Sequence, residues 1–335
     1  MYRILKAWKQ FVILLAVVFL ATGCKGGLPG VVSNPWQVVP LPIEENMLDL
    51  SFTGDKQHGW MVGTNSSLLE TTNGGKTWKQ KVLDLGEQKY RFTSVSFSGD
   101  DGWIAGQPSI LLHTNDGGKA WARLPLSSKL PGSPEKIVSL GNNNAEMTTD
   151  VGAIYRTTDG GKNWKALVAE AFGVMRSIDR TSDGKYLAVS STGNFFSTWE
   201  PGQNIWQPFN RNSSRKLQNM GFTPDGHLWM LARGGQIQFT ASDSPEDWLE
   251  PQNPEFSTSW GLLDLAYRTP EELWVVGGSG NLLVSFDGGK TWQKDHDVED
   301  IPANLYKIVF FDSKTGFIMG QRGTLLKYES TAQTA

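Results

Sequence analysis

The feature that most constrains the fold of this chain is a tryptophan that returns at nearly constant spacing. Successive copies lie 42 to 44 residues apart, and the set comprises Trp36, Trp78, Trp121, Trp164, Trp206, Trp248 and Trp292. A repeat of this length is typical of one blade of a β-propeller, a small sheet that stacks on its neighbours to bury its faces. Seven marks therefore predict seven blades.

Four of these tryptophans end a phrase of the form Asn/Asp-Gly-Gly-Lys-x-Trp, which begins at Asn73, Asp116, Asp159 and Asp287. The phrase resembles the Asp-box of bacterial-neuraminidase-type repeats, and weaker copies end at Trp206 and Trp248. We expect each carboxylate to accept hydrogen bonds from backbone N–H groups of a tight turn, and the glycines to adopt positive φ. Asp116, Asp159 and Asp287 are therefore predicted to be structural, and each tryptophan to fill the space between adjacent blades.

Each repeat contains four strand-sized segments, but the last one, residues 306–328, contains only three. Residues 34–41 match the fourth segment of the other repeats in register. The sequence thus predicts an all-β fold, a seven-bladed propeller of Asp-box repeats over residues 34–330, whose last blade is closed by the N-terminal strand. This closure removes an open sheet edge. Residues 331–335 are expected to form a disordered tail.

The first residues form a leader and not part of the propeller. Three basic residues precede an apolar run over residues 11–21, which suits a signal peptide and is too short to span a bilayer. Small residues then precede Cys24, as in a lipobox, although Ala21 stands where Leu is usual. We predict a signal peptide over residues 1–23, lipidation of Cys24, and a flexible lipid-anchored tether over residues 24–33. The alternative is export without lipidation.

Composition excludes several classes of function. Cys24 is the one cysteine and the four histidines are dispersed, so the sequence predicts no internal disulfide, no zinc site and no cofactor. Without the three basic residues of the leader, 28 of the 31 basic residues remain against 34 acidic ones, a net charge of about −6. This balance argues against nucleic acid as the partner, because phosphate binding requires a basic footprint.

One region departs from the acidic balance. Residues 176–233 hold seven basic and four acidic residues, and arginine predominates. The candidate partner-binding residues are those that loops and strand ends would bring to one face, together with one from the last blade: Arg176, Arg180, Arg211, Arg215, Lys216, Arg233 and Arg322. Arg180 falls near the opposite end of its strand. We interpret the group as a docking patch, because arginine suits planar recognition of carboxylates and carbonyls. The alternative is ordinary solvated loop charge.

An enzyme is the competing hypothesis, since Asp-box propellers include sialidases and other glycosidases. Tyr90-Arg91-Phe92 faintly resembles a sialidase phrase, but Thr93 replaces its proline and the blades number seven instead of six. A pair of catalytic carboxylates cannot be assigned. The sequence therefore favours a protein without catalytic residues.

Several stretches outside the needs of an Asp-box carry a more specific resemblance. They include Ser197–Gly202, Gln218–Gly221, Gly261–Leu265 and Gly277–Leu283. Together they resemble the photosystem II stability and assembly factor family of oxygenic phototrophs over nearly the whole mature chain. The resemblance implies a non-enzymatic, monomeric chaperone on the lumenal side of the thylakoid membrane, lipid-anchored in prokaryotes. It also implies binding of the D1 reaction-centre subunit and early photosystem II assembly intermediates through an arginine patch on one face.

Overall fold

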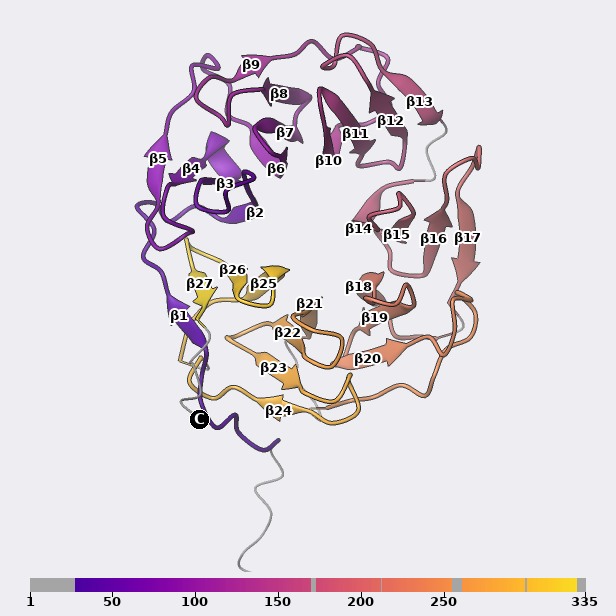
Figure 1. Cartoon of the computed structure of the whole chain (residues 1–335). Coiled ribbons are helices and arrows are strands. Elements are labelled where there is room, and N and C mark those ends of the chain that lie inside the picture. Colours follow the sequence, from indigo (N-terminus) through magenta and orange to yellow (C-terminus); the bar gives the residue numbers. More distant parts are fainter. Residues whose placement is uncertain (1–27, 170–172, 212, 255–260, 299, 330–335) are drawn as a thin grey trace, which may run out of the picture.

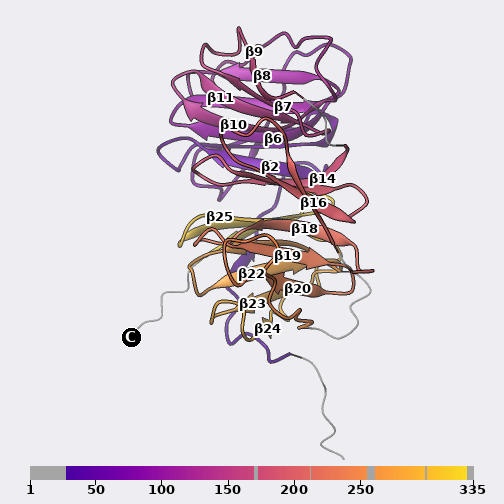
Figure 2. The same cartoon turned by 90° about the vertical axis from the view of Figure 1, so that its right-hand side faces the viewer.

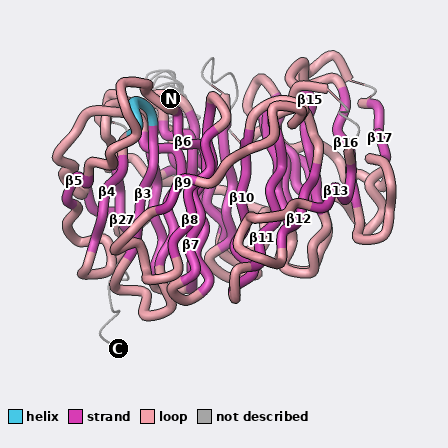
Figure 3. Tube along the Cα trace, turned by 90° about the horizontal axis from the view of Figure 1, so that it is seen from above, coloured by secondary structure: helices cyan, strands magenta, loops and turns pink. Residues whose placement is uncertain are grey.

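The computed structural model describes residues 28–169, 173–211, 213–254, 261–298 and 300–329. Within these ranges 27 strands form seven antiparallel sheets, which follow one another around a ring (Figure 1). Seen from the side, the sheets stand next to one another with loops at both edges of the ring (Figures 2 and 3). The prediction of a seven-bladed propeller is confirmed. The expected leader, Cys24 and the expected tail lie outside the described residues.

Blades 1 to 3 each contain four strands in sequence order. Blade 1 comprises β2 (Met47–Phe52), β3 (Gly59–Gly63), β4 (Leu68–Thr71) and β5 (Lys79–Lys81). Blade 2 comprises β6 (Arg91–Ser98), β7 (Asp101–Gln107), β8 (Ile110–Thr114) and β9 (Ala122–Arg123). Blade 3 comprises β10 (Pro134–Gly141), β11 (Asn144–Thr149), β12 (Ile154–Thr157) and β13 (Lys165–Val168). A short 3₁₀ turn, η1 (Thr64–Ser66), interrupts blade 1.

Blades 4 to 7 complete the ring. Blade 4 comprises β14 (Met175–Arg180), β15 (Tyr186–Ser190), β16 (Phe195–Trp199) and β17 (Gln207–Asn210). Blade 5 comprises β18 (Leu217–Phe222), β19 (Leu228–Ala232) and β20 (Gln236–Phe239). Blade 6 comprises β21 (Leu262–Tyr267), β22 (Leu273–Gly277), β23 (Leu282–Ser285) and β24 (Gln293–Lys294). Blade 7 comprises β25 (Leu305–Asp312), β26 (Thr315–Gly320), β27 (Leu325–Tyr328) and β1 (Trp36–Val38).

The second strand of each blade explains why these sequences stack. Every residue of β3, β15, β19 and β22 is buried, because each sheet is covered by a neighbour on both faces. Such strands read as continuous apolar runs and not as an apolar-polar alternation. Gly63 ends one of them because a Cβ there would lie 2.4 Å from the carbonyl oxygen of Asn46.

The box turns have the predicted geometry. Asp116 Oδ1 accepts hydrogen bonds from the Thr114 hydroxyl at 2.7 Å and from the Ala120 N–H at 3.1 Å, and these bonds hold the pKa of Asp116 below its usual range. Gly117 and Gly118 both have positive φ. Asp159 and Asp287 accept the equivalent bonds. All three carboxylates therefore close turns, as the sequence predicts.

The box tryptophans fill the spaces between blades. The Trp121 ring lies 5.8 Å from that of Trp60 in blade 1, and the Trp164 ring lies 6.0 Å from that of Trp103 in blade 2, both nearly perpendicular. Edge-to-face pairs of this kind stabilise beyond their buried area. Each box therefore fixes its own blade to the blade before it.

The ring is closed by its first strand. β1 pairs antiparallel with β27, with Trp36 opposite Tyr328 and Val38 opposite Leu326. The Trp36 ring packs 5.3 Å from Tyr328 and 5.5 Å from Trp274 of blade 6. The closure predicted from the repeat register is confirmed.

Blade 5 departs from the expected four strands. Between β20 and β21, the part of the chain that the structure describes makes two isolated bridges, from Gln252 to Ile237 and from Trp248 to Thr240. The weak box of this repeat, residues 242–248, contains Pro245 and no glycine, so it cannot form the tight glycine turn that starts a fourth strand.

The segment expected to be a free tether is partly docked. The Val31 N–H donates to the Lys294 carbonyl at 3.0 Å, and the Lys294 N–H donates to the Pro29 carbonyl at 2.9 Å. Leu28 and Val31 also pack against the buried cores of blades 5 to 7. The chain therefore joins the propeller at residue 28, six residues earlier than predicted.

We predict that closure depends on the Trp36 side chain. Trp36→Ala should lower the free energy of unfolding by about 3–5 kcal/mol, because it empties a buried aromatic site between blades 6 and 7. Val38→Ala on the same strand is the control, since Val38 is 65% exposed. Chemical denaturation measures both. Equal losses in the two variants would contradict the closure argument.

We also predict that the box carboxylates act as turn acceptors and not as charges. Asp287→Ala should lower the melting temperature, whereas Asp287→Asn should be tolerated, because Asn73 already accepts the Thr77 N–H at 3.0 Å in blade 1. Neither change should alter partner binding by the folded protein. Calorimetry and a binding assay on the same samples would test both statements, and a stable variant that no longer binds would refute the second.

Candidate functional site

Strand direction gives the ring two distinct faces. Because neighbouring strands within a blade are antiparallel, the loops between blades and the turns between second and third strands lie on one face, here called the loop face. The box turns lie on the opposite face, here called the box face. The sequence predicts the candidate cations on the loop face.

Five of the seven candidates lie together on the loop face of blades 4 and 5. We call Arg176, Arg211, Arg215, Lys216 and Arg233 the basic surface. Arg176 lies near the start of β14, and Arg233 lies in the turn after β19. The other three, Arg211, Arg215 and Lys216, lie in the loop that precedes β18. The Arg233 N–H donates to the Lys216 carbonyl at 2.9 Å, which joins the turn to the interblade loop.

Arg176 extends across the junction between the two blades. One terminal nitrogen donates to Gln218 Oε1 at 2.8 Å, and the other donates to the Ser191 carbonyl at 2.7 Å. Gln218 belongs to β18 of blade 5, whereas Ser191 follows β15 of blade 4. The guanidinium is thus fixed in orientation while it remains exposed.

Neutral groups also orient the cations of the interblade loop. Arg211 donates to Gln236 Oε1 at 2.7 Å, and Arg215 donates to Asn253 Oδ1 at 2.9 Å. Lys216 contacts the side chain of Asn194. Partial burial, and then the charge of Arg215, lower the pKa of Arg211.

The charges of the basic surface are therefore not neutralised by the protein. None of its five members forms an ion pair with another residue of the described ranges. Amide and carbonyl oxygens hold the side chains in place but leave their positive charge intact. Such a surface can bind carboxylate or carbonyl oxygens with charge-assisted hydrogen bonds.

Arg322 occupies the loop face but not the basic surface. It is exposed in the turn between β26 and β27, and its N–H donates to Asn46 Oδ1 at 3.0 Å. It therefore lies at the junction of blades 7 and 1, and blade 6 separates it from blade 5.

Arg180 does not join the basic surface, and its inclusion among the binding residues needs correction. It ends β14, on the side of the box face, and its side chain is 9% exposed. Its Nε donates to Glu146 Oε2 of blade 3 at 2.9 Å, and its guanidinium lies over the Tyr186 ring, 5.5 Å from the ring centre. Arg180 is a buried ion-pair partner that links blades 3 and 4.

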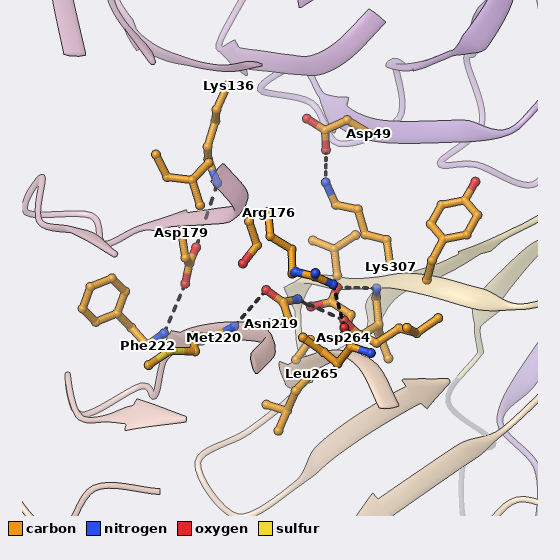
Figure 4. Close-up of a pocket in the computed structure, with 18 of the residues that line it drawn as sticks. Asp49, Lys136, Arg176, Asp179, Asn219, Met220, Phe222, Asp264, Leu265 and Lys307 are labelled. Carbon is orange, nitrogen blue, oxygen red and sulfur yellow. Dashed lines mark hydrogen bonds and ion pairs between the residues drawn. The ribbon is translucent and has the colours of Figure 1, made fainter. Parts of the chain in front are cut away.

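The centre of the ring contains a cavity of about 720 Å³, lined by the inner strands of all seven blades. Figure 4 shows that its charged side chains point toward one another. Lys307 donates to Asp49 Oδ1 at 2.6 Å, and Asp264 accepts from the Asn219 amide at 2.8 Å and from the Ile308 N–H at 2.9 Å. Burial raises the pKa of Asp264 to about 6, although the hydrogen bond from the Ile308 N–H and the charge of Lys307 both act to lower it. These groups join neighbouring inner strands, so we interpret the charged side chains that line the cavity as contacts that hold the blades together.

The structure offers little support for the enzyme hypothesis. Tyr90, the tyrosine of the faint sialidase phrase, is 2% exposed, and its hydroxyl donates to Gln88 Oε1. Among the described residues there is no group of three or more His, Cys, Asp or Glu side chains placed to hold a metal ion.

In the same part of the chain no helix has the length and apolar character needed to cross a membrane.

Sequence reasoning missed the neutral side chains that orient the cations. Gln218, Gln236 and Asn253 carry no charge and match no motif. One signal was present, because Arg176 and Gln218 lie 42 residues apart, which is one repeat. Residues one repeat apart face each other across a blade junction.

Comparison with known proteins finds similar sequences and structures over nearly the whole described propeller. The family model described as photosynthesis system II assembly factor YCF48 matches residues 28–329. Photosystem II assembly lipoprotein Ycf48 of a Synechocystis strain is 63% identical, over 98% of this chain and 95% of the relative. The protein of that name from Trichormus variabilis is 59% identical, over 98% and 96%. A solved structure described as YCF48 bound to D1 peptide is 55% identical, covers 92% of this chain and 99% of that chain, and has a TM-score of 0.90.

We predict that Arg180 and Arg233 act differently despite their shared charge. Arg180→Ala should lower the free energy of unfolding by roughly 3 kcal/mol, the low end of the cost of breaking a buried ion pair. Buried Glu146 would keep only the Tyr186 hydroxyl at 3.0 Å and Arg156 at 3.8 Å as partners. Arg233→Ala should change stability little, because this side chain is exposed and has no partner within the described ranges. Urea denaturation of the two variants measures the difference. A small effect of Arg180→Ala would show that the pair is not needed at the junction.

Proposed function

Because the chain belongs to the photosystem II assembly factor YCF48 family, we propose that it is a non-enzymatic assembly chaperone that docks unassembled D1 during early photosystem II biogenesis. The observation that supports this proposal is the basic surface, where four of the five cations are oriented by neutral partners and none is paired with a carboxylate of the described ranges. A related protein has been solved with a D1 peptide, which supports D1 as the partner.

The chemistry of the basic surface suits a peptide partner. Guanidinium groups present several N–H donors in one plane, which match the paired oxygens of carboxylates and the carbonyls of an extended chain. Residues 176–233 carry an excess of positive charge, whereas the remainder of the mature chain is acidic. An acidic or carbonyl-rich segment would therefore be steered to the basic surface.

The proposed location follows from the leader and from the relatives. The sequence places a lipobox-like cysteine after an export signal, and several relatives are named as lipoproteins. We propose that Cys24 is lipidated and that the propeller lies on the lumenal side of the thylakoid membrane. Cys24 itself is outside the described residues.

Glycoside hydrolysis is the less favoured alternative. It would require an accessible nucleophile and paired carboxylates, whereas Tyr90 is buried and the box carboxylates close turns. A broad glycosidase panel would test it directly, and measurable turnover would overturn the non-enzymatic proposal.

The main test removes the charge of the basic surface. The variant Arg176→Ala, Arg211→Ala, Arg215→Ala, Arg233→Ala should bind the D1 peptide at least about tenfold more weakly, since one lost charge-assisted hydrogen bond costs roughly 1.5–3 kcal/mol. Wild-type binding should weaken as salt rises. Lysine replacements should restore only part of the affinity, because lysine lacks the planar fork. Calorimetric titration measures all three.

A matched control removes four exposed lysines from box turns, Lys76, Lys119, Lys162 and Lys290, and so makes the same change in net charge. This control should bind the peptide like the wild type. If both variants lose affinity equally, net charge and not the basic surface would govern binding. If neither loses affinity, the site lies elsewhere on the ring.

A further inference from the structure

The chain joins the ring at the outer edge of blade 6. Val31 and Pro29 share two backbone hydrogen bonds with Lys294, and the bridge between Gly30 and Lys294 is parallel. In Figures 1 and 2 this indigo segment lies along the outside of the ring beside β24. We call residues 28–31 the strap.

The strap runs from the box face toward the loop face. β24 leaves the box turn of blade 6 and leads toward the loop face, and the parallel bridge gives the strap the same direction. Leu28 therefore lies at the box-face end, where it packs against the buried cluster that contains Trp292. The described chain therefore begins at this corner of the ring.

The distance from this corner to the proposed anchor is short. Four residue steps separate Cys24 from Leu28, and even a fully extended chain spans only about 14 Å over that length. A free tether from Cys24 to Asn34 would instead allow about 35 Å. The strap thus removes more than half of the reach that the sequence suggests.

The same corner carries an exposed apolar side chain at a box position that is polar in blades 1 to 3. Phe286 precedes the box carboxylate of blade 6 and is 48% exposed. The equivalent positions of blades 1 to 3 hold the polar residues Thr72, Asn115 and Thr158. Exposed apolar side chains beside an anchor favour contact with a lipid surface.

From these observations we propose that the box-face corner of blade 6, marked by Phe286 and the strap, is the part of the propeller that contacts the lipid bilayer. This proposal rests on the proposed lipidation of Cys24. Blades 2 and 3, across the ring, then lie farthest from the membrane. The basic surface lies on the opposite, loop face, so the bilayer does not cover it. Because blade 5 adjoins blade 6, that surface remains close to partner segments that emerge from the membrane.

The experiment compares two equivalent positions on opposite sides of the ring. Lys290 in blade 6 and Lys162 in blade 3 occupy the same place in their boxes, and both are exposed. Lys290→Cys and Lys162→Cys would each be labelled with a fluorophore in the full-length lipidated protein, where acylation blocks the thiol of Cys24. The labelled proteins would be bound to phosphatidylcholine vesicles that carry a headgroup quencher.

We expect quenching at position 290 to be several-fold stronger than at position 162. Two further variants should reduce this difference: a long Gly/Ser insertion before Leu28, and Phe286→Ser, which removes the exposed aromatic ring without touching the core. Equal quenching at the two positions on bound protein would overturn the orientation while leaving the anchor intact. Failure to bind vesicles at all would overturn the proposed anchor, and this orientation with it.

Discussion

Each blade of this ring has two apolar faces, so every blade depends on both of its neighbours for burial. The hydrophobic clusters reflect this, since they combine side chains from adjacent blades instead of belonging to one blade. Directional bonds reinforce the stacking: the Trp60 indole donates to the Gly117 carbonyl of blade 2, and the Trp206 indole donates to the Gly152 carbonyl of blade 3. A closed ring is the only arrangement in which no apolar face is left uncovered.

The basic surface uses positions that this stacking leaves free. Arg176, Gln218 and Leu263 occupy the same irregular position near the start of β14, β18 and β21, where the register shifts. One repeat places an arginine there, the next an amide that orients it, and the third an apolar residue. The fold requires none of the three, so a binding residue could be accommodated without loss of packing. At the next position along the inner strands, Asn219 and Asp264 instead join neighbouring blades.

Repetition explains why so much of the fold could be predicted from one sequence. The spacing of the tryptophans indicates the number of blades, and the box phrase indicates the turn chemistry at Asp116 and its equivalents. The register of Trp36 indicates the closure. Each of these inferences depends on a local sequence pattern that recurs in several blades. A blade with a weak copy of the pattern can therefore be assigned from the stronger copies in the other blades.

What could not be predicted depends on contacts that occur once. The pairing of Arg180 with Glu146 depends on which way one side chain turns at a blade junction, and no repeat shares it. Residues 24–33 resemble a linker because they hold three glycines and a proline, yet the backbone of the strap within them pairs with Lys294 regardless of side chains. The orienting amide of Gln218 became recognisable only when the blades were placed side by side. Net charge located the region of the basic surface, and strand order indicated its five members, but neither excluded the buried Arg180.

The pairing of β1 with β27 also has a consequence for how the chain is completed. Trp36 meets Tyr328 from almost the other end of the chain, so the closing sheet is the contact of greatest sequence separation in the fold. Bringing such distant segments together costs loop-closure entropy that local turns avoid, and folds that depend on it form slowly. β1, the first strand of the chain, therefore has no partner until β27, the last strand, is available to pair with it. Until then blade 7 has an unpaired edge, and the nascent protein is most exposed to aggregation just before its ring closes.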